Sequence, residues 1–448
     1  MNRKFLRRMT LPLIAGCLVL ADCSNNTSTS QGPTTAFAVL RLTTSGALDT
    51  TFAGGRGIVT TDIDPGLFDF AMAAAVQPAD NKILAAGSSG LAGQGMIALV
   101  RYNLDGTLDT AGFGTTGTGG IVRTPTPAGW NSASASAIVV QAGNKIVVAA
   151  LAFNASTSTT GIALLRYNPD GTLDTTFNTT GVVPPVAIGP GSPSDTCALA
   201  LQGTNIIVAG ASSNGNVVLY RFDMNGAPDT TFGSNGVTTT PLGAAPASPA
   251  IAFQSTGRII LVSGTNGDQA VLRYSAAGGL DTTFGTSGIV TTDIGMSNNF
   301  ANAVAVQSDD KIVVAGHANV NINAGTSDFS LVRYNADGAL DTSFVGPNSN
   351  PNPPGIVTTD LNGRFDNAFS VALQTPAATP TNILVSGNTG SGGLSQAVVL
   401  RYTSTGALDT TFNSNGFSIS PLVGPGNIGS GNAVVLQSTL GIVVAGYD

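Results

Sequence analysis

One motif repeats through almost the whole chain, and it constrains the fold more than any other feature. The motif begins with Arg, has Gly five residues later and Asp eight residues later, and occurs seven times in 448 residues. The Asp residues run from position 49 to position 409, so the mean period is 60 residues (360 residues over six intervals). Such regularity indicates an array of one structural unit. The seven pairs are Arg41 and Asp49, Arg101 and Asp109, Arg166 and Asp174, Arg221 and Asp229, Arg273 and Asp281, Arg333 and Asp341, and Arg401 and Asp409.

The third copy, RYNPDGTLDTTF, shows why each motif predicts a hairpin. Pro169 presets the φ angle that a type I turn needs, and Gly171 accepts the positive φ of a following bulge. Counting outward from this turn puts Arg166 opposite Asp174 on the neighbouring strand. Because the pair recurs in every copy, we interpret it as a structural staple of the repeat and not as a catalytic site.

Each repeat contains four candidate strands. A Gly-led, β-branched segment follows the motif, such as GIVTT at Gly57, Gly288 and Gly355. An apolar strand ending in Gln comes next, then a Lys-led segment such as KIVVAG at Lys311, and then the strand that carries the motif Arg. The Gln-ended and Lys-led strands are almost continuously apolar, which predicts that both of their faces are covered. A four-stranded unit buried by its neighbours is typical of a β-propeller blade.

The two ends of the repeat region predict how the array closes. The region opens at Ala36 with a lone Arg strand and finishes near Asp448 after a lone Gly-led, Gln-ended and Lys-led set. If the first strand joins the last three, no sheet edge is left incomplete. The sequence therefore predicts an all-β, seven-bladed β-propeller of four-stranded blades, with the N-terminal strand closing the last blade. A β-helix or other solenoid is the alternative, because the period alone permits it.

The recurring R-Y-x-x-x-G-x-L-D-T-x-F-G and K-I-V-V-A-G segments resemble those of the delta-60 repeat family of bacterial exported proteins. The resemblance covers essentially Ala36 to Asp448. It implies propeller-like β repeats, and it implies neither an agreed activity nor catalytic residues. The departures are small: an inserted residue shifts Phe113 in the second copy, and Leu42 and Phe222 replace the usual Tyr.

The N-terminal residues predict export. A basic start is followed by an apolar run from Leu11 to Ala21, which is typical of a signal peptide and too short to span a bilayer. The segment ending at Cys23 resembles a bacterial lipoprotein cleavage box, although Asp22 stands where a small residue is expected. We therefore expect an export signal over residues 1–22, a flexible polar tether over 23–35 and the propeller over 36–448. The protein would be a surface or periplasmic lipoprotein, or, without lipid, a secreted protein.

Composition limits the possible chemistry. The chain contains no Glu and a single His, so it offers few residues for a catalytic triad or a zinc site. Its net charge is −7, which does not favour a nucleic-acid-binding surface. His317 reads as a loop residue, and Cys197 reads as a small buried residue because it lies in an apolar strand pattern. Two further cysteines belong to the leader region, so no disulfide framework is expected.

A few single residues remain as candidate ligands. Asp62, Asp293 and Asp360 each follow an identical GIVTT segment. They read either as Asx turns that end the strand or, if the Gly-led strand is innermost, as a calcium site at the mouth of the channel. We expect the turns, and no cofactor. Trp130, the single Trp, lies in a variable loop and is either a packed anchor or a platform for a sugar.

The variable loops give the function hypothesis. Most of the longer irregular segments fall between the Gly-led and Gln-ended strands and between the Lys-led and Arg strands, which places them on one side of the blades. Pro347 to Pro354 and Thr375 to Thr381 are exceptions that lengthen the opposite side in the sixth blade. The sequence therefore predicts a monomeric, exported, non-enzymatic propeller that binds a glycan or a protein through these loops. An enzyme (a metal-assisted hydrolase or lyase, or a quinone-dependent dehydrogenase) and a purely structural spacer are the alternatives.

Overall fold

The computed structural model describes most of the repeat region, and residues Pro33–Asp448 form one compact unit. The described residues are 35–91, 94–114, 119–191, 196–243, 247–295, 299–321, 326–346, 353–361, 363–374, 381–391, 394–420, 429–438 and 441–447. The expected export signal, Cys23 and almost all of the tether lie outside these residues. No helix in the described part is long and apolar enough to cross a membrane.

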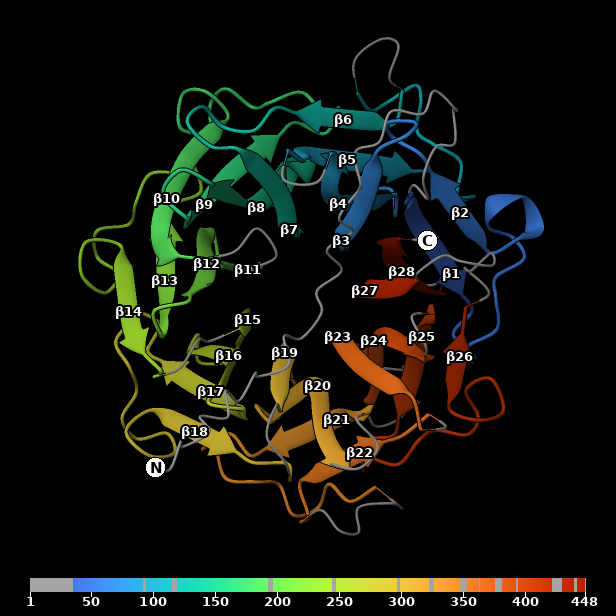
Figure 1. Cartoon of the computed structure of the whole chain (residues 1–448), viewed down its shortest axis with the longest axis vertical. Coiled ribbons are helices and arrows are strands. Elements are labelled where there is room, and N and C mark those ends of the chain that lie inside the picture. Colours follow the sequence, from blue (N-terminus) through green and yellow to red (C-terminus); the bar gives the residue numbers. More distant parts are fainter. Residues whose placement is uncertain are drawn as a thin grey trace, which may run out of the picture. The chain divides into compact units, whose positions relative to one another are not determined.

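Seven antiparallel four-stranded sheets form a ring, so the protein is an all-β, seven-bladed propeller (Figure 1). Two short 3-10 helices, η1 (Ala53–Gly55) and η2 (Ala142–Asn144), lie in turns. In sheet order, the strands are β3 (Phe68–Val76), β4 (Ile83–Gly90), β5 (Met96–Tyr102) and β6 (Ile121–Thr124) in blade 1; β7 (Ser132–Val140), β8 (Ile146–Asn154), β9 (Thr159–Tyr167) and β10 (Val182–Pro190) in blade 2; β11 (Cys197–Gln202), β12 (Asn205–Ser212), β13 (Asn216–Phe222) and β14 (Val237–Pro241) in blade 3; β15 (Ala247–Phe253), β16 (Ile259–Thr265), β17 (Asp268–Tyr274) and β18 (Ile289–Thr292) in blade 4; β19 (Phe300–Val306), β20 (Ile312–Asn321), β21 (Thr326–Tyr334) and β22 (Ile356–Thr359) in blade 5; β23 (Phe365–Gln374), β24 (Asn382–Ser391), β25 (Leu394–Tyr402) and β26 (Phe417–Ile419) in blade 6; and β27 (Ser430–Gln437), β28 (Gly441–Tyr447), β1 (Phe37–Leu42) and β2 (Ile58–Thr61) in blade 7.

The Gln-ended strand is the innermost strand of each blade and the Gly-led strand is the outermost. Strands β3, β7, β11, β15, β19, β23 and β27 surround the centre of the ring, while β2, β6, β10, β14, β18, β22 and β26 lie at its periphery (Figure 1). The alternative that puts the Gly-led strand innermost is wrong. This strand leaves the Arg hairpin directly, so it pairs with the Arg strand and ends up farthest from the channel.

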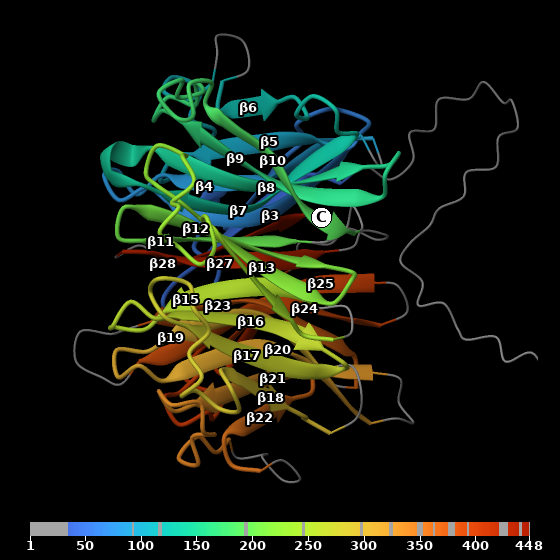
Figure 2. The same cartoon turned by 90° about the vertical axis from the view of Figure 1, so that its left-hand side faces the viewer.

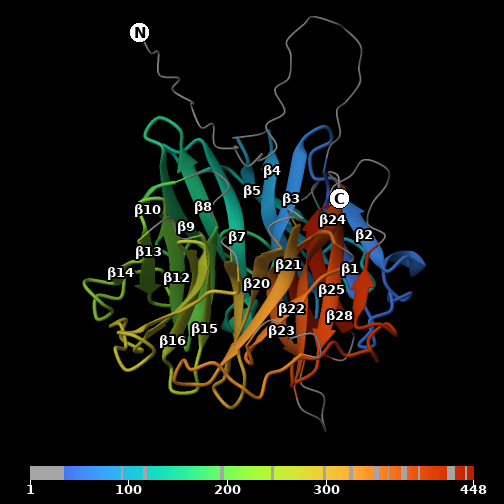
Figure 3. The same ribbon diagram turned by 60° about the horizontal axis from the view of Figure 1, so that its bottom comes forward.

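Both ends of the chain build the closing blade. Strand β1 pairs with β28 along its whole length, from Phe37 opposite Tyr447 to Leu42 opposite Ile442. The predicted closure by the N-terminal strand is confirmed, but β2 also joins this blade on the outer side of β1. The N-terminal residues therefore supply two strands, because each Gly-led strand belongs to the blade of the preceding Arg strand. Figure 3 shows β1 and β2 in blue beside the red β28.

Apolar side chains fill the space between neighbouring blades, whose sheets are seen from the side in Figure 2. Between blades 7 and 1, for example, Phe37 and Val443 pack with Val100. The Gly of the Lys-led strand is needed here because the inner strand bulges toward it. A Cβ atom on Gly87 would lie 1.8 Å from the carbonyl oxygen of Phe70, a distance that no side chain can accept.

The strand directions divide the connections between two faces. The turn face carries the Arg hairpins and the turns from each innermost strand to the next strand. The loop face carries the connections between the two middle strands of a blade and the crossovers from each outermost strand to the following blade. In blade 7 the connection between the middle strands is replaced by the two ends of the described chain, Thr35 and Tyr447.

Candidate functional site

On the turn face, the motif Arg and Asp form a closed polar cluster in every blade. Each Arg Nε atom lies 2.7–2.9 Å from the Oδ2 atom of its Asp. Each guanidinium group also lies 4.5–4.8 Å from the centre of the motif Phe ring, a cation–π contact. These buried phenyl rings and the carboxylates hold the guanidinium group in one orientation.

The same guanidinium groups link each blade to the next around the ring. Each Arg Nη1 atom donates a hydrogen bond to a carbonyl oxygen in the hairpin of the following blade. The accepting residues are Leu104, Pro169, Met224, Ala276, Ala336, Ser404 and, in the hairpin of the closing blade, Thr44. Burial alone would raise the pKa of Asp49, but hydrogen bonds from Thr51 and Arg41 hold it below its usual range. We assign the seven clusters to the stability of the ring.

Lysine residues at the start of the Lys-led strands reinforce three of these clusters. Lys82, Lys145 and Lys311 place their Nζ atoms 2.7, 2.9 and 3.1 Å from the Oδ2 atoms of Asp109, Asp174 and Asp341. Sequence reasoning missed this role. The available signal was that every Lys outside the leader begins a Lys-led strand.

The three Asp residues that follow GIVTT lie at the outer rim of the loop face, not at the mouth of the channel. Two of them close tight turns: the Oδ1 atom of Asp293 accepts the Gly295 N–H at 2.9 Å, and that of Asp360 accepts the Gly363 N–H at 2.6 Å. The bond of Asp293, to the residue two positions on, is that of an Asx turn, whereas the bond of Asp360 reaches the residue three positions on. Asp62 is exposed and lines a groove on the outer wall. No group of three or more His, Cys or Asp side chains in the described part of the chain has the arrangement of a metal site.

Some of these carboxylates face other carboxylates. Strand register puts Asp328 beside Asp360, because their neighbours Phe329 and Thr359 are paired. Burial, together with the charges of Asp360 and Asp366, raises the pKa of Asp328 to about 6. Asp268 and Asp293 repeat the arrangement in blade 4, where burial and the neighbouring charge also raise the pKa of Asp268. Carboxylates therefore lie next to one another on the loop face, whereas on the turn face each motif carboxylate is paired with an Arg.

Two fully buried carboxylates fix the crossovers on this face. The Oδ2 atom of Asp69 accepts the Ile63 N–H at 2.7 Å, and the Oδ2 atom of Asp366 accepts the Leu361 N–H at 2.6 Å. Each bond ties the start of an innermost strand to the crossover that precedes it. Burial raises the pKa of both carboxyl groups. The sequence signal was a Phe-Asp pair at the start of two innermost strands, which the sequence analysis did not single out.

The Phe of each Phe-Asp pair is exposed on the loop face. Phe68 is 40% exposed, and Phe365 is 52% exposed at the equivalent position of blade 6. The ring of Phe68 is parallel to that of Phe70 at 6.2 Å, and Phe70 meets Tyr447 edge to face at 4.8 Å. We call Phe68, Phe70 and Tyr447 the aromatic patch. It spans the seam between blades 7 and 1, and its outermost ring is open to solvent.

The remaining single residues are packed into the blades. The Trp130 ring covers Gly161, where an added Cβ atom would lie 2.6 Å from it, and it packs against the core of blades 1 and 2. His317 lies within β20, so the expectation of a loop residue is wrong. Its ring stacks on Phe300 at 4.7 Å, and burial lowers its pKa to about 4, so the imidazole is neutral at pH 7. Burial raises the pKa of Cys197 to about 12, so its thiol stays protonated.

Six segments of the chain match the model of a β-propeller family described as a domain of unknown function (DUF5122): residues 27–52, 79–111, 141–177, 205–232, 307–344 and 382–412. These segments contain six of the seven Arg–Asp pairs. No curated protein matched the sequence.

Solved structures with similar folds share little sequence with this chain. A protein of Lactobacillus plantarum is 13% identical with a TM-score of 0.43, over 92% of this chain and 99% of that chain. A protein of unknown function from Dyadobacter fermentans is 15% identical with a TM-score of 0.36, over 59% and 76%. The α-L-arabinofuranosidase of Fusarium graminearum is 10% identical with a TM-score of 0.42, over 82% and 98%. Similarities at this level carry no conclusion about function.

Proposed function

We propose that this protein is an exported, non-enzymatic β-propeller that binds a glycan through its loop face, with a protein surface as the alternative ligand. We also assign its repeats to the delta-60 type, on the resemblance of the Arg and Lys-led motifs. The observation that carries the proposed function is the pair of exposed rings Phe68 and Phe365, which occupy equivalent positions beside the carboxylates of the loop face.

The chemistry of this surface suits a sugar. A sugar ring presents an apolar side of C–H groups that can cover a phenyl ring, and a rim of hydroxyl groups that donate to carboxylates. Asp62 and Asp360 are both exposed and lie within the crossovers that lead to Phe68 and Phe365. Since these groups are negatively charged, a neutral or amine-bearing glycan fits the surface better than an acidic one.

The contrast with the turn face supports the choice of surface. On the turn face, the motif charges are paired inside the protein and the hairpins repeat with little variation. The loop face carries the longer irregular connections, which is where binding residues are commonly found on a rigid scaffold. We infer no reaction from the turn face, because its Arg–Asp clusters serve the ring.

Retention on immobilised polysaccharides tests the proposal. The protein would be passed over cellulose, chitin, xylan and peptidoglycan, and the bound fraction compared with that of Phe68→Ala/Phe365→Ala. We expect the double variant to lose at least tenfold in affinity, which corresponds to about 1.4 kcal/mol or more. Leu104→Ala/Met224→Ala is the matched control, because these exposed apolar residues lie on the turn face. Equal retention of both double variants, or no retention of the original protein on any glycan, would contradict glycan binding.

One observation favours a hydrolase as the second candidate. Asp328, with a pKa of about 6, lies opposite the exposed Asp360, and a carboxyl group with a raised pKa can act as the general acid beside a second carboxylate in glycoside hydrolysis. Release of reducing sugar from the retained polysaccharide, abolished by Asp328→Asn and kept in Phe68→Ala, would replace the binding proposal with this one.

Export and anchoring rest on the N-terminal sequence. We propose that Cys23 carries a lipid after cleavage of the leader. Cys23→Ser should then move the protein from the membrane fraction to the soluble fraction of cells that process lipoproteins. Unchanged fractionation would favour secretion without a lipid.

A further inference from the structure

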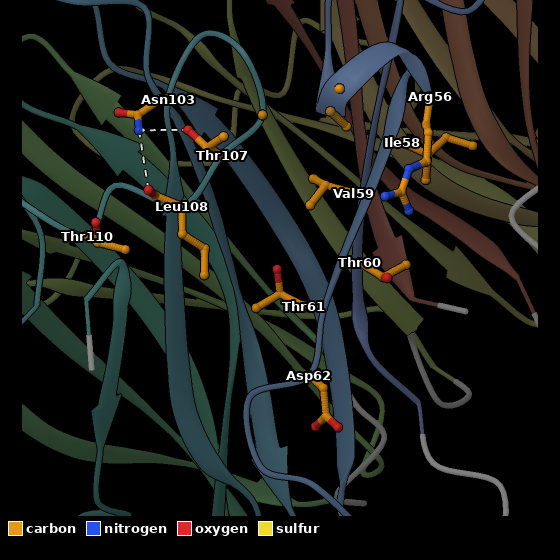
Figure 4. A pocket seen from close by; sticks show the side chains of 13 residues that line it. Arg56, Ile58, Val59, Thr60, Thr61, Asp62, Asn103, Thr107, Leu108 and Thr110 are labelled. Carbon is orange, nitrogen blue, oxygen red and sulfur yellow. Dashed lines mark hydrogen bonds between the residues drawn. The ribbon is translucent and has the colours of Figure 1, made fainter. Parts of the chain in front are cut away.

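An open groove runs along the outer wall of the propeller at the closing seam (Figure 4). One wall is strand β2 of blade 7, and the other is the segment Asn103–Thr110 of blade 1. The end of the groove is closed by η1, whose Ala53 N–H donates to the Asp105 carbonyl at 2.6 Å. The cavity volume is about 1270 Å³, which is above the roughly 300–1,000 Å³ of most small-molecule sites.

Strand β2 offers unpaired main-chain groups along this groove. The Arg41 N–H donates to the Gly57 carbonyl at 2.9 Å, so Val59 and Thr61 continue the set of hydrogen-bonded positions opposite β1. The N–H and C=O groups of Ile58 and Thr60 therefore point away from β1. Within the described residues, β2 pairs only with β1 and is the edge of its sheet. An exposed edge is a template for one more strand.

Two side chains of opposite charge lie at the two ends of β2. Arg56 lies at the start of β2 and Asp62 follows its last residue, and Figure 4 shows them at opposite ends of the strand. Both side chains are exposed, and neither forms an ion pair with another described residue. The turn between the motif Phe and the Gly that precedes β2 is one residue longer than the same turn in four of the other copies. Arg56 lies in this longer turn.

We propose that this groove binds an extended peptide segment, which adds to β2 as a fifth, outermost strand of blade 7. The peptide runs antiparallel to β2. A basic residue near its N-terminal end meets Asp62, and an acidic residue six positions later meets Arg56, because seven extended residues span about 20 Å. Main-chain hydrogen bonds to Ile58 and Thr60 hold the segment, and the charges set its direction and register. The proposal is independent of glycan binding, which uses the loop face.

The direct test uses a labelled peptide of defined sequence, Lys-Thr-Val-Thr-Val-Thr-Asp, and measures its binding to the full chain by fluorescence anisotropy. Thr60→Pro removes the outward N–H group at an edge position that tolerates proline, and we expect at least a tenfold loss of affinity. Thr291→Pro is the matched control. Thr291 holds the same position in β18, opposite Ala270, and its substitution should leave the affinity unchanged.

Charge exchange provides the second arm of the test. Arg56→Glu/Asp62→Lys should weaken binding of this peptide and restore binding of the reversed-charge peptide Asp-Thr-Val-Thr-Val-Thr-Lys. Binding that fails to saturate by roughly 1 mM, or that is equal in Thr60→Pro and Thr291→Pro, would overturn the proposal. Sedimentation showing a dimer that Thr60→Pro dissociates would also overturn it, since the occupant would then be a second copy of this chain.

Discussion

The turn face and the loop face of the same blades use Asp in opposite ways. On the turn face, each motif Asp forms an ion pair with an Arg, and several also form one with a Lys. On the loop face, Asp328 lies opposite Asp360 and Asp268 lies opposite Asp293. The first arrangement stabilises the ring. The second costs folding free energy, and it is kept on the face that carries the irregular loops and the exposed Phe residues.

The largest expected difference between the faces concerns two Arg–Asp pairs. Arg41→Ala should lower the free energy of unfolding by about 3–5 kcal/mol, because it leaves Asp49 buried without its charge partner. The Arg41 side chain is 3% exposed, whereas Arg123, which pairs with Asp64 on the loop face, is 35% exposed. Arg123→Ala should cost less than about 1 kcal/mol. Denaturant unfolding of both variants measures the contrast, and equal losses would remove the distinction between the faces.

A smaller difference should appear as opposite responses to neutralising an Asp. Asp174→Asn on the turn face should destabilise the protein at pH 7.5, since Arg166 and Lys145 lose their partner. Asp328→Asn on the loop face should stabilise it at the same pH, by roughly 1 kcal/mol after allowance for solvent screening. Melting temperatures of the two variants measure both effects.

The pH dependence follows from the direction of each shift. The pKa of Asp328 is about 6 in the folded protein, above its ordinary value of 3.8, so its stabilising contribution is complete below pH 3.8 and is lost as the pH rises through 6. The benefit of Asp328→Asn should therefore disappear near pH 4. The pKa of Asp174 is lowered, despite burial, by hydrogen bonds from Lys145 and Thr176 and by the charge of Arg166, so its contribution is complete above the ordinary value of 3.8 and is lost progressively as the pH falls below it. A benefit of Asp328→Asn that is the same at pH 4 and pH 8 would contradict this account.

The smallest expected effect concerns calcium at the rim of the loop face. Asp293 already accepts the Gly295 N–H, so calcium in millimolar excess and a chelator should leave the melting temperature unchanged. Asp293→Asn should be nearly silent in the same assay. A bound cation at a hundredfold excess over its Kd would add about 2.7 kcal/mol, which melting experiments resolve easily. A calcium-dependent rise in melting temperature that Asp293→Asn abolishes would show that the loop-face carboxylates form a metal site.

The repeat made most of the fold predictable. The spacing of the Arg motif, the Lys-led strands and the unpaired segments at the two ends was enough to predict seven closed blades. The radial order of the strands was not predictable in this way, because a strand's place in a blade depends on which neighbour it pairs with. The GIVTT strand pairs with the Arg strand before it, so Asp62 lies at the outer wall and not at the channel mouth, where the calcium alternative had placed it.

The candidate site was less predictable because its members are single residues. Phe68 and Phe365 look like ordinary apolar residues at the start of a strand, and only the structure shows that their rings face solvent. Trp130 is the opposite case. The sequence allows it to be either a packed anchor or a platform for a sugar, and the structure packs its ring on Gly161. Exposure depends on the bulge and the crossover around each residue, which periodicity does not report.

Hydrogen–deuterium exchange with and without a retained polysaccharide tests whether the loop face is the binding surface. We expect slower exchange in the crossovers before Phe68 and Phe365, residues 60–70 and 358–367, with no change in the Arg hairpins of the turn face. The same segments of Phe68→Ala/Phe365→Ala should show no slowing. Slower exchange in the Arg hairpins, with unchanged exchange in both crossovers, would show that the protein binds through the face assigned here to stability.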